Sequence, residues 1–153
     1  MDTSIERTVR ADPRKVFGLA AAVEDWPRIL PHYRWVRILS AGGDDTRMVE
    51  MAARRDIVGR LGFPLRWTAI QRVHPVEMRI EFEHVGGLTR GMRVAWTIAP
   101  RADSTVRVQI RHVFEPRWPV PDTLVRAVVG EYFVNGVARR TLRHIAELAQ
   151  GPS

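Results

Sequence analysis

The chain has 153 residues and a mass of 17.5 kDa, which is the size of one domain, and we expect a single domain over residues 1–153. It has no cysteine, so disulfides, thiolate catalysis and cysteine-bound metal centres are excluded. The formal net charge is +7, but no basic run is longer than two residues, so we expect no nucleic-acid partner.

The N-terminal part of the chain predicts a strand followed by two short helices. Residues 4–10 alternate between apolar and polar side chains, as a half-buried strand does. Asp12 and Pro13 then form a helix-start signal, with Asp12 as the N-cap and Pro13 at the first helical position. That helix is predicted over residues 14–23, and a second helical turn over residues 24–30.

Between residues 33 and 115 the apolar side chains recur with a period of two, which predicts a meander of antiparallel strands. We expect these strands near 33–40, 46–55, 64–73, 78–84, 90–99 and 105–115. One parity should face the last helix and the other should face water. The inward set is Met78, Ile80, Phe82, Val94, Trp96, Val108 and Ile110, and the outward set includes Glu81, Arg93 and Arg111.

The C-terminal part predicts one long helix, because the apolar period changes to 3.6 over residues 122–150. Asn135 and Gly136 interrupt the apolar stripe, and glycine costs about 1 kcal/mol inside a helix, so we expect a bend there. The whole pattern predicts an α+β fold, in which a curved antiparallel sheet of about seven strands wraps around the last helix. The space between that sheet and the helix is the natural ligand site.

The sequence also bears on location. The first residues lack the apolar stretch of a signal peptide. The longest apolar run, near 19–23, is far shorter than the ~20 residues of a membrane span. We therefore expect a cytoplasmic protein without a transmembrane segment.

Three stretches resemble a known family: VEDWPRILP at 23–31, WTAIQ at 67–71 and VARRTL at 137–142. With the order of the elements, they resemble the SRPBCC superfamily, in particular its polyketide cyclase/dehydrase branch and the related coenzyme-Q-binding START-like proteins. The resemblance covers nearly the whole chain. It implies a START-like helix-grip fold, with two short helices after the first strand and a cavity for a hydrophobic ligand. Members include aromatase/cyclases and lipid or quinone carriers, so it implies no single activity.

The same resemblance bears on two residues. In the aromatase/cyclases, a tryptophan in the first stretch and an arginine on a mid-sheet strand help to hold or activate the polyketide. Trp26 matches that tryptophan, whereas Gln71 stands where the arginine is expected. Arg72 is adjacent, but alternation along the strand directs it to the opposite face. The resemblance implies that Trp26 and Gln71 position the ligand.

Two histidines and an arginine are the candidate chemical groups. The chain has no His-Glu-x-x-His, Gly-x-Ser-x-Gly or phosphate-loop motif, so we predict neither a metal nor a cofactor. His84 and His112 have inward parity, and a turn near 86–88 would bring them close to Arg90 at one end of the cavity. Such a group can polarise a carbonyl or transfer protons. The alternative is that these side chains hydrogen-bond to loops and to the start of the last helix.

The predicted hairpin register groups the inward side chains into two rows. Phe82, Met92 and His112 form one row, and Trp67, His84, Arg90 and Phe114 form the next row, nearer the mouth. The aromatic residues are either ligand contacts or core. Tyr132 and Asn135 lie on the apolar side of the helix, where they hydrogen-bond a ligand or satisfy internal polar groups. The candidate ligand-binding set is Trp26, Trp67, Gln71, Phe82, Met92, Trp96, Phe114, Tyr132 and Asn135.

The outward parity is rich in arginine. One interpretation is a solvated face with weak cross-strand ion pairs. The other is a docking face for an acidic partner, such as an acyl carrier protein, or for anionic lipid. The arginines concerned are Arg66, Arg72, Arg79, Arg93, Arg107 and Arg111.

These observations predict a domain that binds a hydrophobic, partly oxygenated small molecule, such as a polyketide, lipid or quinone. As an enzyme it would be a polyketide cyclase or aromatase that folds a poly-β-ketone chain, with acid–base help from His84, Arg90 and His112. The alternative is a lipid or quinone carrier or chaperone that performs no chemistry. A third hypothesis is a regulatory interaction domain that acts through its basic face.

Overall fold

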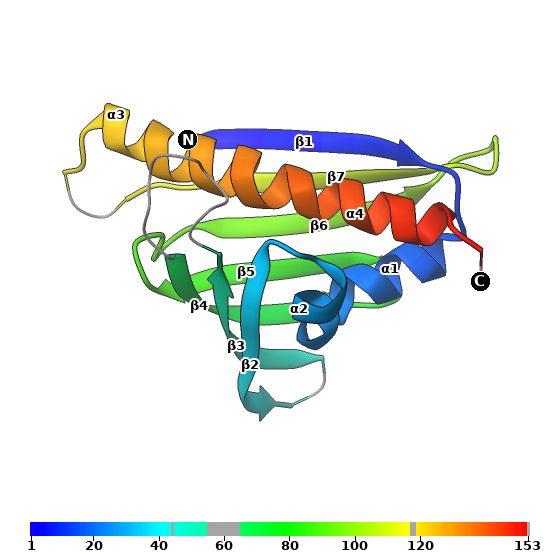
Figure 1. The fold of residues 1–153 in the computed structure, drawn as a ribbon, viewed down its shortest axis with the longest axis horizontal. Helices are drawn as coiled ribbons and strands as arrows, with labels where there is room; N and C mark the ends of the chain where they lie inside the picture. The colour runs from blue at the N-terminus through cyan, green and yellow to red at the C-terminus, as the bar shows by residue number, and fades with distance from the viewer. Residues whose placement is uncertain (44, 55–64, 117–118, 153) are drawn as a thin grey trace.

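The computed structural model forms one antiparallel sheet in which seven strands follow the order β1-β7-β6-β5-β4-β3-β2 (Figure 1). It describes residues 1–43, 45–54, 65–116 and 119–152, without the side chains at 128, 131 and 132. The N-terminal strand pairs with the last one, so only β1 and β2 are edge strands. The strands are β1 (Asp2–Val9), β2 (Tyr33–Gly42), β3 (Thr46–Ala53), β4 (Leu65–His74), β5 (Arg79–Gly86), β6 (Arg93–Pro100) and β7 (Val106–Val113).

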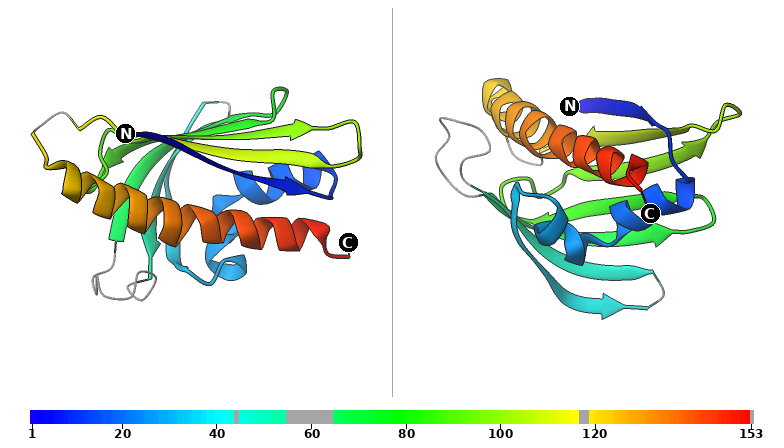
Figure 2. Two further views of the ribbon diagram at one scale, coloured as in Figure 1. Left: turned by 90° about the horizontal axis from the view of Figure 1, so that it is seen from above. Right: turned by 45° about the vertical axis from the view of Figure 1, so that its right-hand side comes forward.

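Helical segments cover one face of this sheet (Figure 2). After β1 come α1 (Pro13–Ala21), the 3₁₀ turn η1 (Val23–Asp25) and α2 (Trp26–Ile29). The predicted start of the first helix is confirmed, since the Asp12 carboxylate accepts a hydrogen bond from the Arg14 backbone N–H at 2.8 Å. No helix in the described part of the chain is long and apolar enough to cross a membrane.

The C-terminal helix runs the length of the sheet, but it is not uniformly α-helical. It begins as α3 (Asp122–Val125), continues as the π-helix η2 (Arg126–Ala138) and ends as α4 (Arg139–Gln150). The single helix predicted over residues 122–150 therefore contains a 13-residue π-helical segment, and Asn135 and Gly136, where we expect a bend, lie within it. That segment also holds Gly130, and each glycine weakens α-helical winding by about 1 kcal/mol.

The predicted parity of the strands is confirmed. On β5, Ile80 is 0% and Phe82 6% exposed, whereas the side chain of Glu81 between them is 33% exposed. The arginines predicted to point outward do so, and Arg93 and Arg111 are exposed. The predicted strand ends at residues 55 and 64 lie outside the described residues.

The predicted register, by contrast, is wrong by two residues in three hairpins: His84 pairs with Ala69, not with Trp67, and the next two hairpins show the same offset. Phe82 pairs with Val94, not with Met92, and Val94 pairs with His112. The turn after β5 is longer than predicted because Gly87 and Gly91 both adopt positive φ angles, +96° and +97°, which glycine tolerates without strain. A slip of two residues preserves which face each side chain occupies but changes its neighbours.

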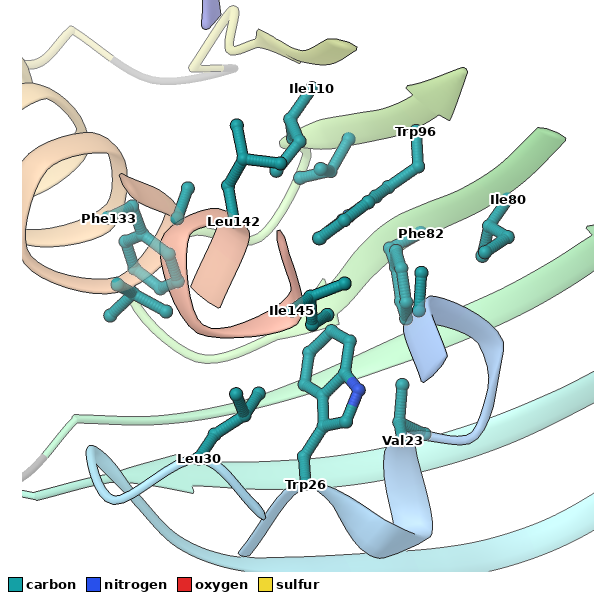
Figure 3. Close-up of a cluster of buried hydrophobic side chains, with 14 of the residues drawn as sticks. Val23, Trp26, Leu30, Ile80, Phe82, Trp96, Ile110, Phe133, Leu142 and Ile145 are labelled. Atoms are coloured by element: carbon teal, nitrogen blue, oxygen red, sulfur yellow. The ribbon is translucent and has the colours of Figure 1, made fainter. Parts of the chain in front are cut away.

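The core fills the space between the concave face of the sheet and the last helix. Figure 3 shows Trp26 extending from α2 toward Ile145 of α4, with Phe82 and Trp96 of the sheet beside it. The ring centroids of Trp26 lie 6.3 Å from Phe82 and 6.2 Å from Trp96. This packing fixes the walls of the interior site.

Candidate ligand-binding cavity

A cavity of about 50 Å³ lies between the sheet and the junction of η2 with α4. Strands β2 to β7, α2 and the last helix all contribute to its wall, so the fold itself assembles it. The lining is mainly aromatic and aliphatic, with four polar side chains. The residues are Trp26, Tyr33, Met51, Trp67, Phe82, His84, Val94, Trp96, Ile110, His112, Phe133, Val137, Ala138 and Thr141.

The aromatic wall is held in place by a hydrogen bond outside the cavity and by ring contacts within the wall. The Trp26 indole N–H donates to the backbone carbonyl of Leu19 at 3.0 Å, which satisfies its only polar atom and leaves the ring as an apolar surface. The Trp67 ring meets Phe133 edge-on, with centroids 4.9 Å apart. It also stacks parallel to the His84 ring, with centroids 6.0 Å apart.

His84 is a buried, neutral imidazole. It is 4% exposed, and burial lowers its pKa to about 3, with the proximity of His112 as a second cause. Its Nδ1 lies 2.7 Å from the Thr89 hydroxyl, in the turn after β5. The Thr89 hydroxyl restrains the orientation of the ring, and the His84 side chain itself forms part of the cavity wall.

His112 carries a buried polar atom without a partner in the described part of the chain, as His32 does at its Nδ1. The side chain of His112 is 3% exposed, and burial lowers its pKa to about 4. Its Nδ1 is buried and makes no hydrogen bond within the described part of the chain. A buried polar atom without a partner costs about 1–3 kcal/mol, so this nitrogen calls for a hydrogen-bonding group supplied by a ligand or by water.

A second polar corner lies where β2 meets the last helix. The Thr141 hydroxyl donates to the backbone carbonyl of Val137 at 2.8 Å, so His32 Nε2, 2.7 Å away, must donate to the Thr141 oxygen. Tyr33 lies beside this pair, with its ring centroid 4.8 Å from that of His32, and burial raises the pKa of Tyr33. Burial, followed by the nearby His144, Arg140 and Arg143, lowers the pKa of His32 to about 4. Both ends of the cavity therefore carry uncharged hydrogen-bonding groups.

The structure brings six of the predicted site residues to the cavity. They are Trp26, Trp67, Phe82, His84, Trp96 and His112. Met92 and Phe114 are buried but do not line it, because the two-residue difference in register places Val94 beside His112. The side chain of Tyr132 lies outside the described residues.

Three other predicted positions need correction. Arg90 is exposed in the turn between the two glycines of positive φ, and Thr89 occupies the place beside His84. Gln71 is 0% exposed but does not line the cavity, because its amide donates to the Ala21 carbonyl and accepts from Arg47. Asn135 is exposed and accepts from the Arg139 side chain at 2.8 Å, because π-helical winding shifts the phase of the apolar stripe.

Sequence reasoning missed His32, Tyr33, Thr89, Phe133 and Thr141. Sequence patterns indicate a structural place for two of them. Tyr33 is the first residue of the strand predicted at 33–40, and Thr141 directly precedes the buried, apolar Leu142 of the last helix. The hydrogen bond between His32 and Thr141 joins residues 109 apart in the chain, which no local sequence pattern reports.

The sequence of this chain matches a known family over most of its length. Residues 9–139 match the model described as polyketide cyclase/dehydrase and lipid transport. The chain belongs to this family. No curated protein sequence matches it significantly.

Several solved structures share the START-like helix-grip fold of this chain. The Zhui aromatase/cyclase from Streptomyces sp. R1128 is 18% identical, with a TM-score of 0.79 over 98% of this chain and 93% of that one. A START superfamily protein from Mycobacterium smegmatis is 18% identical, with a TM-score of 0.73 over 96% and 98%. The di-domain ARO/CYC BexL from the BE-7585A biosynthetic pathway is 24% identical, with a TM-score of 0.74 over 99% of this chain and 48% of that one.

Proposed function

We propose that the cavity binds a neutral, hydrophobic small molecule that carries at least one oxygen, and that the protein acts on it as a polyketide cyclase/aromatase-like enzyme. The observation that carries this proposal is the unpartnered, buried Nδ1 of His112 in an otherwise aromatic wall. The membership of the chain in the polyketide cyclase/dehydrase family supports it.

The wall selects for a neutral ligand. Every residue in the described lining is uncharged at neutral pH, because burial keeps the pKa values of His84 and His112 near 3 and 4. A carboxylate or an ammonium group would therefore enter without a counter-charge, which is strongly unfavourable. A carbonyl or an enol can instead hydrogen-bond to His112 Nδ1 as acceptor or donor, according to the imidazole tautomer.

The cavity must enlarge to accept such a ligand. Its volume of about 50 Å³ is well below the roughly 300–1,000 Å³ of typical ligand pockets. Phe133, Val137 and Ala138 are the wall residues carried by η2, whose π-helical winding is less regular than that of α4. We assign the enlargement to this part of the wall, since the sheet side is fixed by continuous strand pairing.

The chemistry follows from a poly-β-ketone bound in this site. His112 accepts a proton from a carbon between two carbonyls, and that carbon forms a bond to a second carbonyl carbon of the same chain. The carbonyl oxygen that receives the electron pair takes the proton back from His112, and the resulting hydroxyl then leaves as water with a hydrogen of the adjacent carbon, which forms a C=C bond. His84, fixed by Thr89, hydrogen-bonds a carbonyl oxygen, while Trp26 and Trp67 hold the chain folded. An acidic acyl carrier protein would deliver the chain. Arg90 has no role here, because it is exposed.

A second candidate is a non-catalytic carrier of a quinone or lipid. The pKa values of about 3 and 4 favour it, because a general base works best with a pKa near the ambient pH. In that function the two imidazoles only hydrogen-bond to the ligand oxygens.

Product analysis separates the two functions. The purified protein is incubated with acyl-carrier-bound polyketides of several chain lengths, and the products are compared by mass spectrometry with a protein-free control. For a cyclase we expect new cyclic products and a loss of about 10²–10⁴-fold in turnover for His112→Ala, with nearly unchanged ligand affinity. Arg90→Ala, in the exposed turn, is the matched control and should retain turnover.

Two results would reject the enzyme function or both functions. Unchanged product profiles together with binding of a ubiquinone analogue or a fluorescent lipid would replace the enzyme by the carrier. Failure to bind any neutral hydrophobic probe would refute both functions.

A further inference from the structure

The outer face of the sheet has two halves that differ in how their arginines are compensated. On β1, on β5 to β7 and at the end of β4 that holds Arg72, carboxylates pair with most of the guanidinium groups. Arg111 lies 2.5 Å from Asp2, Arg72 lies 3.1 Å from Glu83, and Arg107 pairs with Glu6. The arginines of this half are largely neutralised by their own sheet.

The other half contains a groove with excess positive charge. It lies between the outer side of β2 to β4 and the turn at Gly87 and Leu88, and its volume is about 830 Å³. Three arginines face a single carboxylate, that of Glu50, which lies 3.7 Å from Arg37. Arg34 and Arg66 are exposed and form no ion pair with any described residue. The lining is Arg34, Trp35, Arg37, Glu50, Ala52, Leu65, Arg66, Trp67, Thr68, Gly87 and Leu88.

Local packing gives this groove a defined shape. The Arg37 guanidinium lies 4.2 Å from the centre of the Trp35 ring, which orders both side chains along the edge strand. At the opposite rim, Gly87 packs against β4 so closely that a Cβ atom there would lie 2.7 Å from the Arg66 carbonyl oxygen. The turn is thereby held against the strand, with Leu88, 59% exposed, at the rim.

We propose that this groove binds a small, soluble molecule that bears a phosphate ester. Arginine presents a planar array of N–H donors that matches phosphate oxygens, and three arginines line this one hollow. Leu88 and the exposed edge of Trp35 contact the organic part of the ligand. In the described linings the groove and the interior cavity share Trp67 alone, and the three arginines of the groove are absent from the cavity wall, so the proposal does not rest on the function of the cavity.

A small molecule fits the groove better than a lipid bilayer does. The volume falls within the roughly 300–1,000 Å³ of small-molecule sites, and the site is a hollow, whereas a bilayer contacts a protruding surface. Membrane surfaces are also bound through several exposed apolar side chains, whereas Leu88 is the one large exposed apolar side chain in the described lining.

The test is titration of the full chain with adenosine monophosphate and with inorganic pyrophosphate, at constant ionic strength, while the Trp35 indole N–H signal is followed by NMR. We expect saturable shifts with both probes. The double variant Arg34→Gln/Arg66→Gln should lose at least about tenfold in affinity for both. The matched control Arg79→Gln/Arg107→Gln removes the same charge from the paired half and should change affinity by less than about threefold. Leu88→Ser should weaken only the nucleotide.

Three results would overturn the proposal. The first is the absence of saturable binding by either probe. The second is an equal loss of affinity in the control variant, which would show that net charge alone attracts the anions. The third is binding through Arg34 and Arg66 to phosphatidylglycerol vesicles or to polyglutamate without binding of either small probe, which would assign the groove to a membrane or to an acidic protein.

Discussion

The two faces of the sheet carry basic side chains under opposite conditions. On the outer face, arginines remain charged and are paired with carboxylates or exposed to water, as with Arg72 and Glu83. On the inner face, His84 and His112 are buried and their pKa values fall to about 3 and 4, so they are uncharged at neutral pH. The outer face can therefore recognise the charge of a ligand, whereas the inner face can recognise only its hydrogen-bonding groups and apolar surface.

The largest expected effect is a loss of stability when a side chain on the packed inner face is shortened. Ile80 is 0% exposed on β5, so Ile80→Ala should lower the free energy of unfolding by about 2–5 kcal/mol. Arg93→Ala, an exposed outward position on the neighbouring strand, should change it by no more than about 0.5 kcal/mol. Urea denaturation measures both. Similar losses for the two variants would contradict the assignment of faces.

The next prediction concerns the charge state of the inner face. Burial lowers the pKa of His112 from 6.5 to about 4, so between these pH values the unfolded chain binds a proton that the folded chain does not. Stability should therefore fall as the pH is lowered from 6.5 to 4, and His112 alone should account for about 3 kcal/mol of that fall.

The variant His112→Gln isolates this contribution. Its free energy of unfolding, measured by urea denaturation across the same pH range, should fall by about 3 kcal/mol less than that of the parent chain. Arg93→Gln serves as the control on the outer face, because arginine keeps its charge at every pH in the range. If the curves of His112→Gln and the parent run parallel, His112 is not buried in its neutral form.

Strand parity made most of the inner face predictable from sequence. A period of two fixes which side a residue faces, so Trp67, Phe82, His84 and His112 could be placed on the concave side without coordinates. Parity cannot fix register, because a slip of two residues leaves every side chain on the same face. Met92 was therefore placed in the row that Val94 occupies.

Three features lay beyond local patterns. The exposure of Arg90 depends on two glycines with positive φ in one turn, and the sequence alone does not reveal which turn they form. The exposure of Asn135 depends on π-helical winding, which periodicity analysis assumes to be α-helical. The corner of His32, Tyr33 and Thr141 depends on a contact between distant segments.

The smallest expected effect concerns the paired half of the outer face. The Arg72 and Glu83 side chains are 42% and 45% exposed, so water screens their attraction and holding both in place costs side-chain entropy. A double-mutant cycle with Arg72→Ala and Glu83→Ala should give a coupling free energy of about 0.2–1 kcal/mol at low salt. In 1 M salt the screening length falls to about 3 Å, which matches the separation of the charges, and the coupling should nearly vanish. A coupling that persisted in high salt would mean that this pair is shielded from water, and the two faces would then differ only in how far their charged groups are exposed.

A coupling that disappears in high salt, together with a pH-dependent loss of stability at His112, would establish that solvent exposure separates the chemistry of the two faces.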